Sequence, residues 1–455
     1  MDETKRLEEA DVRYLWHPFT QMKDWAAERP VIIEEARGCF LKDITGRWYL
    51  DGVSSLWVNI HGHRKKEIDD AIKAQIDKVS HSTLLGLSNT PAIRLAEKLV
   101  HLVRSSLSCH PSALSRVFYS DNGSTSVEIA LKMAFQYWRL KGINGRNSFL
   151  SLDNAYHGDT LGAVSVGGID TFHKAFGPLL FRTFRAPSPY CYRCDAGKSC
   201  PDCGLFCLTR MEAVLSGHHR EIAAVILEPL VQAAGGMIVA PTGYLRGVRD
   251  LCTKYNVLMI ADEVATGFGR TGKMFACAHE SVTPDILCLS KGITGGYLPL
   301  AATLATDEIY EAFLGEFRDL KTFFHGHSYT GNPLACAAAL ACFDIFERED
   351  TLNSLQPRIR VLEEWLREVS GWAHVGDARN KGLMAGVELV RDKQTKEPYP
   401  WEEKMGWRVA YHARDNGVMI RPLGNVIVIM PPLSISTEEL IRLLNVIGSA
   451  IREVT

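Results

Sequence analysis

Short apolar runs alternate with amphipathic stretches through the middle of the chain. Helical periodicity is clearest over residues 124–140, and the apolar residues that share one face there are Val127, Leu131, Ala134 and Trp138. The runs that predict buried strands are 116–119, 149–152, 224–227 and 257–261. Strands that alternate with helices predict an α/β fold whose mostly parallel sheet is flanked by helices. Ligands of such folds bind beyond the carboxyl ends of the strands.

The pattern changes beyond Asn332-Pro333. A long apolar helix is predicted over 334–346, followed by a shorter set of helices and strands, with strands near 383–390 and 426–430. Near the start of the chain, 39–43 and 48–52 predict two strands joined by a turn. We therefore expect an N-terminal arm with strands at 1–59, a large domain at 60–330 and a small α+β domain at 331–455.

The composition limits the kinds of partner that the protein is expected to bind. The chain has 455 residues and a formal net charge of -2, which argues against electrostatic binding of nucleic acid. The first ten residues lack the apolar core of a signal peptide, and no run approaches the roughly 18 apolar residues of a membrane span. We expect a cytoplasmic protein with no nucleic-acid or membrane partner.

Cysteines fall into two groups. Seven of the twelve stand singly in apolar segments and are expected to be small buried hydrophobes. The other five are Cys191, Cys194, Cys200, Cys203 and Cys207. Two CxxC pairs are typical of zinc, but the gap between these pairs is shorter than the usual spacing of about 15 to 20 residues. Structural zinc and reduced or surface-oxidised thiols both stay open. We favour thiols and predict no metal site.

An acidic residue, Asp262, ends one predicted strand, and Lys291 follows 29 residues later. A lysine amine becomes a nucleophile when it is held deprotonated, and an imine with an aldehyde cofactor holds it so. A buried aspartate beside a pyridine nitrogen keeps that nitrogen protonated, so the ring accepts electrons. The pair therefore predicts a pyridoxal 5'-phosphate site, although each residue alone occurs by chance in many α/β proteins. Glycine-rich turns at 266–272 and 295–296 favour a bound ligand.

Residues 260–296 resemble the signature of the class III, fold-type I aminotransferases. Further motifs extend the resemblance along the chain, namely Trp16-His-Pro-Phe-Thr, Tyr156-His-Gly-Asp and Ile420-Arg-Pro-Leu-Gly. Together they are similar to one branch of that family, the adenosylmethionine-8-amino-7-oxononanoate aminotransferases of biotin synthesis. The resemblance implies a fold-type I large domain, an N-terminal arm that packs with the small domain, and pyridoxal-phosphate-dependent transamination of 8-amino-7-oxononanoate to 7,8-diaminononanoate.

Two predicted strand ends supply the rest of the cofactor site. Gly123 and Ser124 open a predicted helix, where free N–H groups and the helix dipole suit a phosphate, although Ser124 could instead be an ordinary N-cap. Tyr156 is placed to stack on the cofactor ring, opposite Val264. His157 is interpreted as a structural hydrogen-bonding residue. The expected catalytic residues are Lys291, Asp262 and Tyr156, with Lys291 as the proton shuttle.

The resemblance also implies residues shared between subunits. In the loop 325–333, the hydroxyl of Ser328 is expected to reach the phosphate of the neighbouring subunit's cofactor, with His327 beside it. Gly326 in the same loop is expected to contact substrate. This arrangement predicts a homodimer with its active sites at the subunit interface.

Substrate contacts follow from the same resemblance. Arg421 is expected to bind the substrate carboxylate, a role that suits a guanidinium, although a surface ion pair would also explain it. Phe19, Leu56 and Trp57 are expected to line the substrate site, together with Tyr156 and Lys291. The run 14–22 is too aromatic for a solvated arm, so we expect it to be buried.

Two of these positions depart from better-known members of the branch. Phe19 stands where they carry tyrosine, and Leu56 where they carry the first of two tryptophans. Both changes remove groups that could hold a bulky adenosyl donor. The amino donor therefore stays open between S-adenosylmethionine and lysine.

Three alternatives remain. A broader ω-amine or 4-aminobutyrate aminotransferase would share every cofactor residue, and an aminomutase of the same fold would isomerise a single substrate. A non-catalytic protein could use the cysteine segment as a metal-dependent interaction module. The presence of both Asp262 and Lys291 argues against this last alternative.

Overall fold

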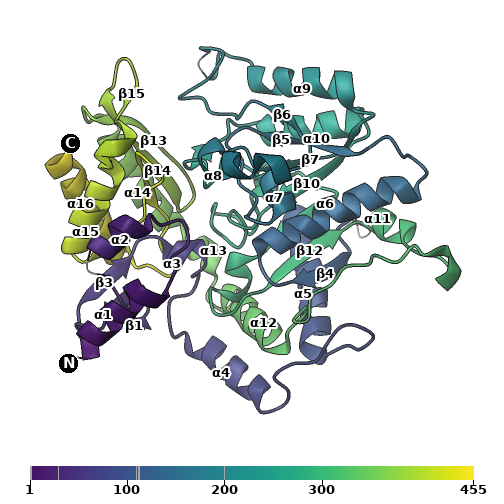
Figure 1. Cartoon of the computed structure of the whole chain (residues 1–455), viewed down its shortest axis with the longest axis horizontal. Coiled ribbons are helices and arrows are strands. Elements are labelled where there is room, and N and C mark those ends of the chain that lie inside the picture. The colour runs from purple at the N-terminus through teal and green to yellow at the C-terminus, as the bar shows by residue number, and fades with distance from the viewer. Residues whose placement is uncertain (1–2, 29, 109, 111–112, 199) are drawn as a thin grey trace.

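The computed structural model describes residues 3–28, 30–108, 110, 113–198 and 200–455. Its largest sheet has seven strands (Figure 1). In spatial order these are β4 (Arg116–Ser120), β12 (Ala301–Ala305), β11 (Ile286–Leu289), β10 (Leu258–Asp262), β7 (Ile222–Leu227), β5 (Ser148–Leu152) and β6 (Phe184–Ala186). Only β12 runs against its neighbours. The expected α/β architecture with a mostly parallel sheet is confirmed.

Helices cover both faces of this sheet. The strands alternate between the two cores, so that Ile260 of β10 packs on the side of α6 (Gly123–Leu140) and Met259 on the other side. The predicted stripe of α6, including Val127 and Trp138, is buried there. The elements of the other face include α5 (Thr90–Leu107), α9 (Phe206–His218) and α10 (Tyr244–Lys254). Both faces are apolar, which explains why the strands read as continuous hydrophobic runs.

Shorter elements lie in the loops around this sheet and beside α6. They are α7 (Leu161–Val166), α8 (Asp170–His173), α11 (Asp307–Ala312) and the hairpin of β8 (Val231–Gln232) and β9 (Ile238–Val239). The long helix α12 (Pro333–Arg348) packs against α4 (Lys66–Ile76) and α5 and leads to α13 (Thr351–Ser354).

The C-terminal sheet is antiparallel. It consists of β13 (Val375–Lys381), β14 (Met384–Asp392), β15 (Glu397–Pro398) and β17 (Val426–Ile429), with helices α14 (Gln356–Val369), α15 (Met405–Asp415) and α16 (Thr437–Val454) around it. A separate N-terminal sheet contains β1 (Ile33–Arg37), β2 (Phe40–Asp43) and β3 (Trp48–Asp51). Its fourth strand, β16 (Val418–Met419), comes from the C-terminal part and pairs in parallel with β3. The domain boundaries at 59/60 and 330/331 stay a prediction.

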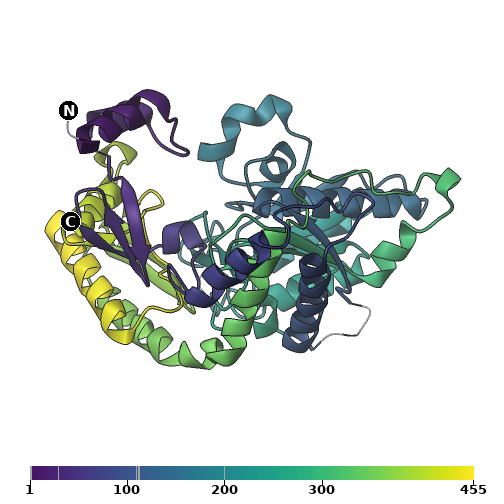
Figure 2. The same ribbon diagram turned by 90° about the horizontal axis from the view of Figure 1, so that it is seen from below.

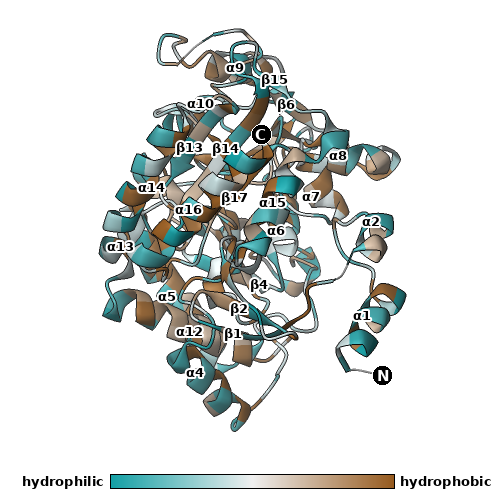
Figure 3. Cartoon of the chain, turned by 90° about the vertical axis from the view of Figure 1, so that its left-hand side faces the viewer, coloured by the Kyte–Doolittle hydropathy of each residue, from teal (hydrophilic) through white to brown (hydrophobic). Residues whose placement is uncertain are grey.

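The N-terminal helices α1 (Glu3–Tyr14) and α2 (Met22–Ala27) lie on the outside of the molecule (Figures 2 and 3), where Asp24 of α2 pairs with Lys404 and Glu28 accepts the Tyr411 hydroxyl at 3.0 Å. Neither contains a buried residue, and Trp16 between them is 89% exposed. The expectation that the run 14–22 is buried is therefore wrong for a single chain. The contacts that this run makes, such as His17 with Asp11 and Phe19 with Phe172, leave the rings of Tyr14 and Trp16 exposed.

Six of the seven single cysteines are buried, as predicted, and Cys109 lies outside the described residues. Within the described parts of the chain, helices are all too short or too polar to cross a bilayer.

Candidate active site

A cavity of about 620 Å³ opens at the carboxyl ends of the parallel strands. Side chains that follow β4, β5, β7, β10 and β11 face it, as the strand-end argument predicts. The cavity gathers seven of the residues singled out from the sequence: Trp57, Gly123, Ser124, Tyr156, Asp262, Val264 and Lys291.

Lys291 follows β11 with a left-handed backbone (φ 47°), a conformation that a non-glycine residue keeps only where its surroundings enforce it. Its Nζ lies 4.8 Å from the centroid of the Trp57 ring. Burial of the amine lowers the Lys291 pKa, while Asp262 and Glu228 oppose part of that effect. The amine is therefore biased toward the neutral form that acts as a nucleophile.

Asp262 ends β10 in a buried position. Its Oδ1 accepts the Val264 amide at 3.1 Å, and its Oδ2 lies 2.7 Å from Nδ1 of His157. His157 is buried as well, and with the proton on Nδ1 it donates to the carboxylate. The interpretation of His157 as a structural hydrogen-bonding residue is confirmed. It holds one oxygen of the Asp262 carboxylate in place. The carboxylate can still accept a hydrogen bond from a protonated ring nitrogen of a bound ligand.

Glu228 was missed from the sequence. It follows β7, lines the cavity and is buried. Its Oε1 accepts the Tyr156 amide at 3.1 Å and its Oε2 accepts the Ala233 amide at 2.9 Å. Burial raises the Glu228 pKa to about 7, with His157 lowering it and Asp262 raising it further. A signal existed, because a lone carboxylate directly after an apolar strand is the pattern that identified Asp262.

The start of α6 has the features of an anion site. Its N-cap is Asn122, whose side chain accepts the Thr125 amide, so the alternative of Ser124 as N-cap is wrong. The Ser124 hydroxyl accepts the Asp159 amide at 3.1 Å and keeps its own proton for another partner. The amides of Gly123 and Ser124 lie in the first turn, where a helix offers no backbone acceptor.

Close backbone approaches shape this end of the cavity. A Cβ on Gly123 would come within 2.6 Å of Val264 Cγ1, and a Cβ on Gly158 within 2.1 Å of Ser124 Oγ. Gly158 also has a φ of +122°, which L side chains rarely adopt. Free helix-start amides, a buried carboxylate and a desolvated amine in one cavity fit the phosphate, ring nitrogen and aldehyde of pyridoxal phosphate.

Tyr156 lines the cavity, and its hydroxyl donates to Asp159 at 2.6 Å. Its ring is stacked with that of His173 at a centroid distance of 6.3 Å. Stacking of Tyr156 on a cofactor ring opposite Val264 stays a prediction.

Six predicted residues lie outside the lining of this cavity: Phe19, Leu56, Gly326, His327, Ser328 and Arg421. Two of them are linked to it. Arg421 donates to the Phe19 carbonyl at 3.0 Å, and the Phe19 ring meets Phe172, which in turn meets Tyr156. Arg421 forms no ion pair within the described residues, and burial lowers its pKa. Most of its guanidinium donors thus remain free for a carboxylate, and the ion-pair alternative has no support.

Gly326, His327 and Ser328 do not line the cavity of their own chain, although His327 lies beside Asp121, which does. His327 Nδ1 lies 2.8 Å from a carboxylate oxygen of Asp121, and Tyr329 packs on His81. Neither contact brings the Ser328 hydroxyl to the residues expected to bind phosphate.

The cysteine segment contains five free thiols, at least partly accessible. Across the described residues, no group of three or more His, Cys, Asp or Glu side chains is arranged to hold a metal ion. The segment does not border the cavity.

Comparison with known proteins gives the same picture. The sequence model of the family described as aminotransferase class-III matches residues 22–451. An adenosylmethionine-8-amino-7-oxononanoate aminotransferase of Geobacter sulfurreducens is 56% identical over 454 residues, covering 100% of this chain and 99% of that protein. The crystal structure of a protein with the same name from Methanocaldococcus jannaschii superposes with a TM-score of 0.93 at 49% identity, covering 99% and 100%. A PLP-bound amine transaminase from an uncultivated Pseudomonas species superposes with a TM-score of 0.91 at 38% identity, covering 97% and 99%.

Proposed function

This chain belongs to the class-III aminotransferase family, and on that premise we propose that it transfers an amino group to 8-amino-7-oxononanoate to give 7,8-diaminononanoate, a step of biotin synthesis. The observation that carries the proposal is the 56% identity, over the whole chain, to a relative named for that reaction. The fold-type I architecture expected from the motifs agrees with the structural likenesses at TM-scores of 0.91 and 0.93.

Pyridoxal phosphate, when bound, supplies an aldehyde for the amine of Lys291 and a ring that accepts electrons. Asp262, oriented by His157, holds a proton on the ring nitrogen. The amides of Gly123 and Ser124 bind the phosphate. Lys291 Nζ removes the proton from the amine-bearing carbon of the donor and later delivers one to the carbonyl carbon of the oxo acid, and the lowering of its pKa by burial favours the neutral amine that accepts the first proton.

Arg421 binds the carboxylate of the oxo acid, and Trp57 and Phe19 border its methylene chain. Support comes from the free guanidinium donors of Arg421 and from its contact with the Phe19 carbonyl. The donor is S-adenosylmethionine or lysine. Phe19 and Leu56 are the positions at which this chain lacks groups expected to hold the adenosyl part.

One assay separates the possibilities. Purified holoenzyme is supplied with 8-amino-7-oxononanoate and either S-adenosylmethionine or lysine, and the diamine is measured by mass spectrometry. We expect diamine with one of the two donors. Amino transfer from 4-aminobutyrate with no diamine from either donor would instead favour a broader ω-amine aminotransferase. This alternative is the main rival, because an amine transaminase has a very similar structure. Bound zinc and no visible cofactor absorbance would favour the interaction module.

We also propose a homodimer that completes the site. Large apolar side chains are exposed along 314–329, among them Phe317 at 99% and Phe324 at 72%. Leu85 is exposed beside this segment and lies close to Gly326. Exposed apolar surface of this extent is typical of an interface between chains. Ser328 is exposed on the same surface, and we propose that its hydroxyl reaches the phosphate bound by the other chain.

Mixed dimers test this arrangement. Lys291→Ala and Ser328→Asp are each expected to be inactive, the second because its carboxylate repels the phosphate. If Ser328 acts across the interface, dissociation and mixing of the two variants restores one intact site per mixed dimer and about a quarter of wild-type activity, as expected when chains pair at random. Absence of recovery from mixed dimers of demonstrated composition would place Ser328 in its own chain's site.

A further inference from the structure

One tight turn separates Glu228 from Arg379. Residues 233–237 join β8 to β9, and the amides of Gly236 and Met237 both donate to the Ala233 carbonyl, at 3.2 and 2.9 Å. On one side of the turn, the Ala233 amide donates to Glu228. On the other side, the carbonyls of Gly236 and Met237 accept Nη2 and Nε of Arg379 at 2.6 and 2.8 Å. The turn thus connects a guanidinium of the C-terminal sheet to a carboxylate of the cavity.

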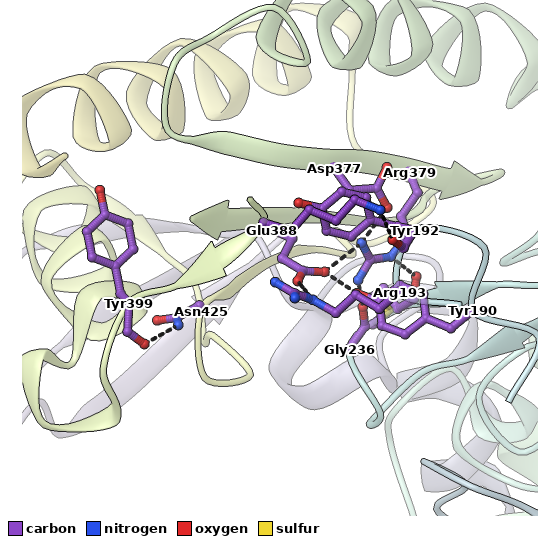
Figure 4. A network of polar contacts seen from close by, with 11 residues as sticks. Tyr190, Tyr192, Arg193, Gly236, Asp377, Arg379, Glu388, Tyr399 and Asn425 are labelled. Atoms are coloured by element: carbon purple, nitrogen blue, oxygen red, sulfur yellow. Dashed lines mark hydrogen bonds and ion pairs between the residues drawn. The ribbon is translucent and has the colours of Figure 1, made fainter. Parts of the chain in front are cut away.

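The guanidinium of Arg379 lies in a network of polar contacts (Figure 4). Nη1 of Arg379 donates to Asp377 at 2.6 Å and to Glu388 at 3.1 Å. Glu388 is buried on β14 and also accepts Nε of Arg193 at 2.6 Å and the Tyr190 hydroxyl. Since a planar guanidinium has its donors in a fixed fork, carboxylates on one edge determine where the other edge points. That other edge meets the turn.

The packing around the turn leaves little freedom. A Cβ on Gly386 of β14 would come within 2.9 Å of the Met237 Cβ, so the strand lies directly on the turn. Met237 itself has a left-handed backbone with a φ of 54°. Burial of an arginine and a glutamate is a poor source of stability, because desolvation offsets the attraction between them. The pair instead fixes the orientation of the Arg379 guanidinium, which makes charge-assisted hydrogen bonds to two defined carbonyls.

We propose that Arg379 is a positioning residue for Glu228. Held by Glu388 and Asp377, it fixes the turn 233–237 so that the Ala233 amide keeps the Glu228 carboxylate at the cavity. Glu228 in turn accepts the Tyr156 amide, so the backbone of the expected ring-stacking residue depends on the same chain of contacts. The role in catalysis rests on the proposed function, since Glu228 matters there only if the cavity holds the cofactor.

The first test needs no cofactor. Arg379→Lys keeps the charge but loses the fork, and Arg391→Lys makes the same change at an exposed position of β14. Amide hydrogen exchange is compared in cofactor-free protein. We expect exchange across 228–237 to be about tenfold faster in Arg379→Lys and unchanged in Arg391→Lys. Unchanged exchange in Arg379→Lys, or faster exchange throughout β13 and β14, would overturn the proposal, the latter by showing a general structural role.

The second test asks whether the effect passes through Glu228. The rate at which excess S-adenosylmethionine or lysine, whichever reacts, converts the bound cofactor in a single turnover is measured for Arg379→Lys, Glu228→Gln and both changes together. We expect Arg379→Lys to slow conversion about tenfold in the wild-type background but less than about twofold beside Glu228→Gln. Equal factors in the two backgrounds would overturn the proposal. Failure of the proposed function would be seen separately, because wild-type enzyme would then form no diamine while the differences in hydrogen exchange between wild type and Arg379→Lys would remain.

Discussion

Ionisation of Glu228 should make the free energy of unfolding depend on pH, with a sign and a size that follow from its raised pKa. Burial raises its pKa from 4.5 to about 7 in the folded protein, so the folded state binds a proton there that the unfolded state has released. The stabilising effect of the protonated form is complete below pH 4.5 and is lost as the pH rises through 7. At about 1.4 kcal/mol per pKa unit, the ionised carboxylate costs the folded state about 3 kcal/mol at pH 8.

Glu228→Gln removes this titration and keeps the shape of the side chain. Urea unfolding of cofactor-free wild type and Glu228→Gln is compared at pH 5 and pH 8, and the difference between the two proteins cancels the titration of groups that do not interact with Glu228. We expect the difference in unfolding free energy to move by about 2 kcal/mol in favour of the variant as the pH rises, since part of the change occurs below pH 5. A difference that is the same at both pH values would refute the reasoning, because a constant offset reports only lost hydrogen bonds.

Three further substitutions test other parts of the site. Arg421→Met should raise KM for the oxo acid by about 10- to 100-fold, since a charged hydrogen bond to the carboxylate contributes about 1.5 to 3 kcal/mol; an unchanged KM for the oxo acid would contradict it. Gly158→Ala should weaken pyridoxal phosphate binding at least about tenfold in a fluorescence titration, because its Cβ meets Ser124 and its φ of +122° is strained; unchanged affinity would exclude Ser124 from the phosphate site. His157→Leu should lower kcat about tenfold or more at unchanged KM, because Asp262 loses an orienting bond, and full activity would show that Asp262 is held without it.

Periodicity and strand-end position were enough to predict much of the site. The apolar run 257–261 and the helix 124–140 correspond closely to β10 and α6. β10 is buried inside the large sheet and α6 is buried against its face, so the apolar residues of both follow the pattern of burial. Asp262, Lys291 and Gly123 then meet in one cavity because the carboxyl ends of parallel strands share an edge.

Other features depend on contacts between distant parts of the chain. His157 and Asp262 are 105 positions apart, and the pairing of Arg379 with the Gly236 carbonyl joins two sheets, so no local pattern marks either one. Glu228 was recognisable by the rule that identified Asp262 but was not singled out. The aromatic run 14–22 predicts burial that a single chain does not provide, which agrees with the homodimer proposed above.

Covalent capture of the cofactor tests the central claim most directly. Holoenzyme is reduced with borohydride, digested and mapped by mass spectrometry, with Lys291→Ala treated in parallel. The account predicts one pyridoxyl phosphate adduct, on the peptide that contains Lys291, and neither adduct nor turnover in the variant. An adduct on another lysine, or a variant that keeps both its yellow colour and its turnover, would contradict it.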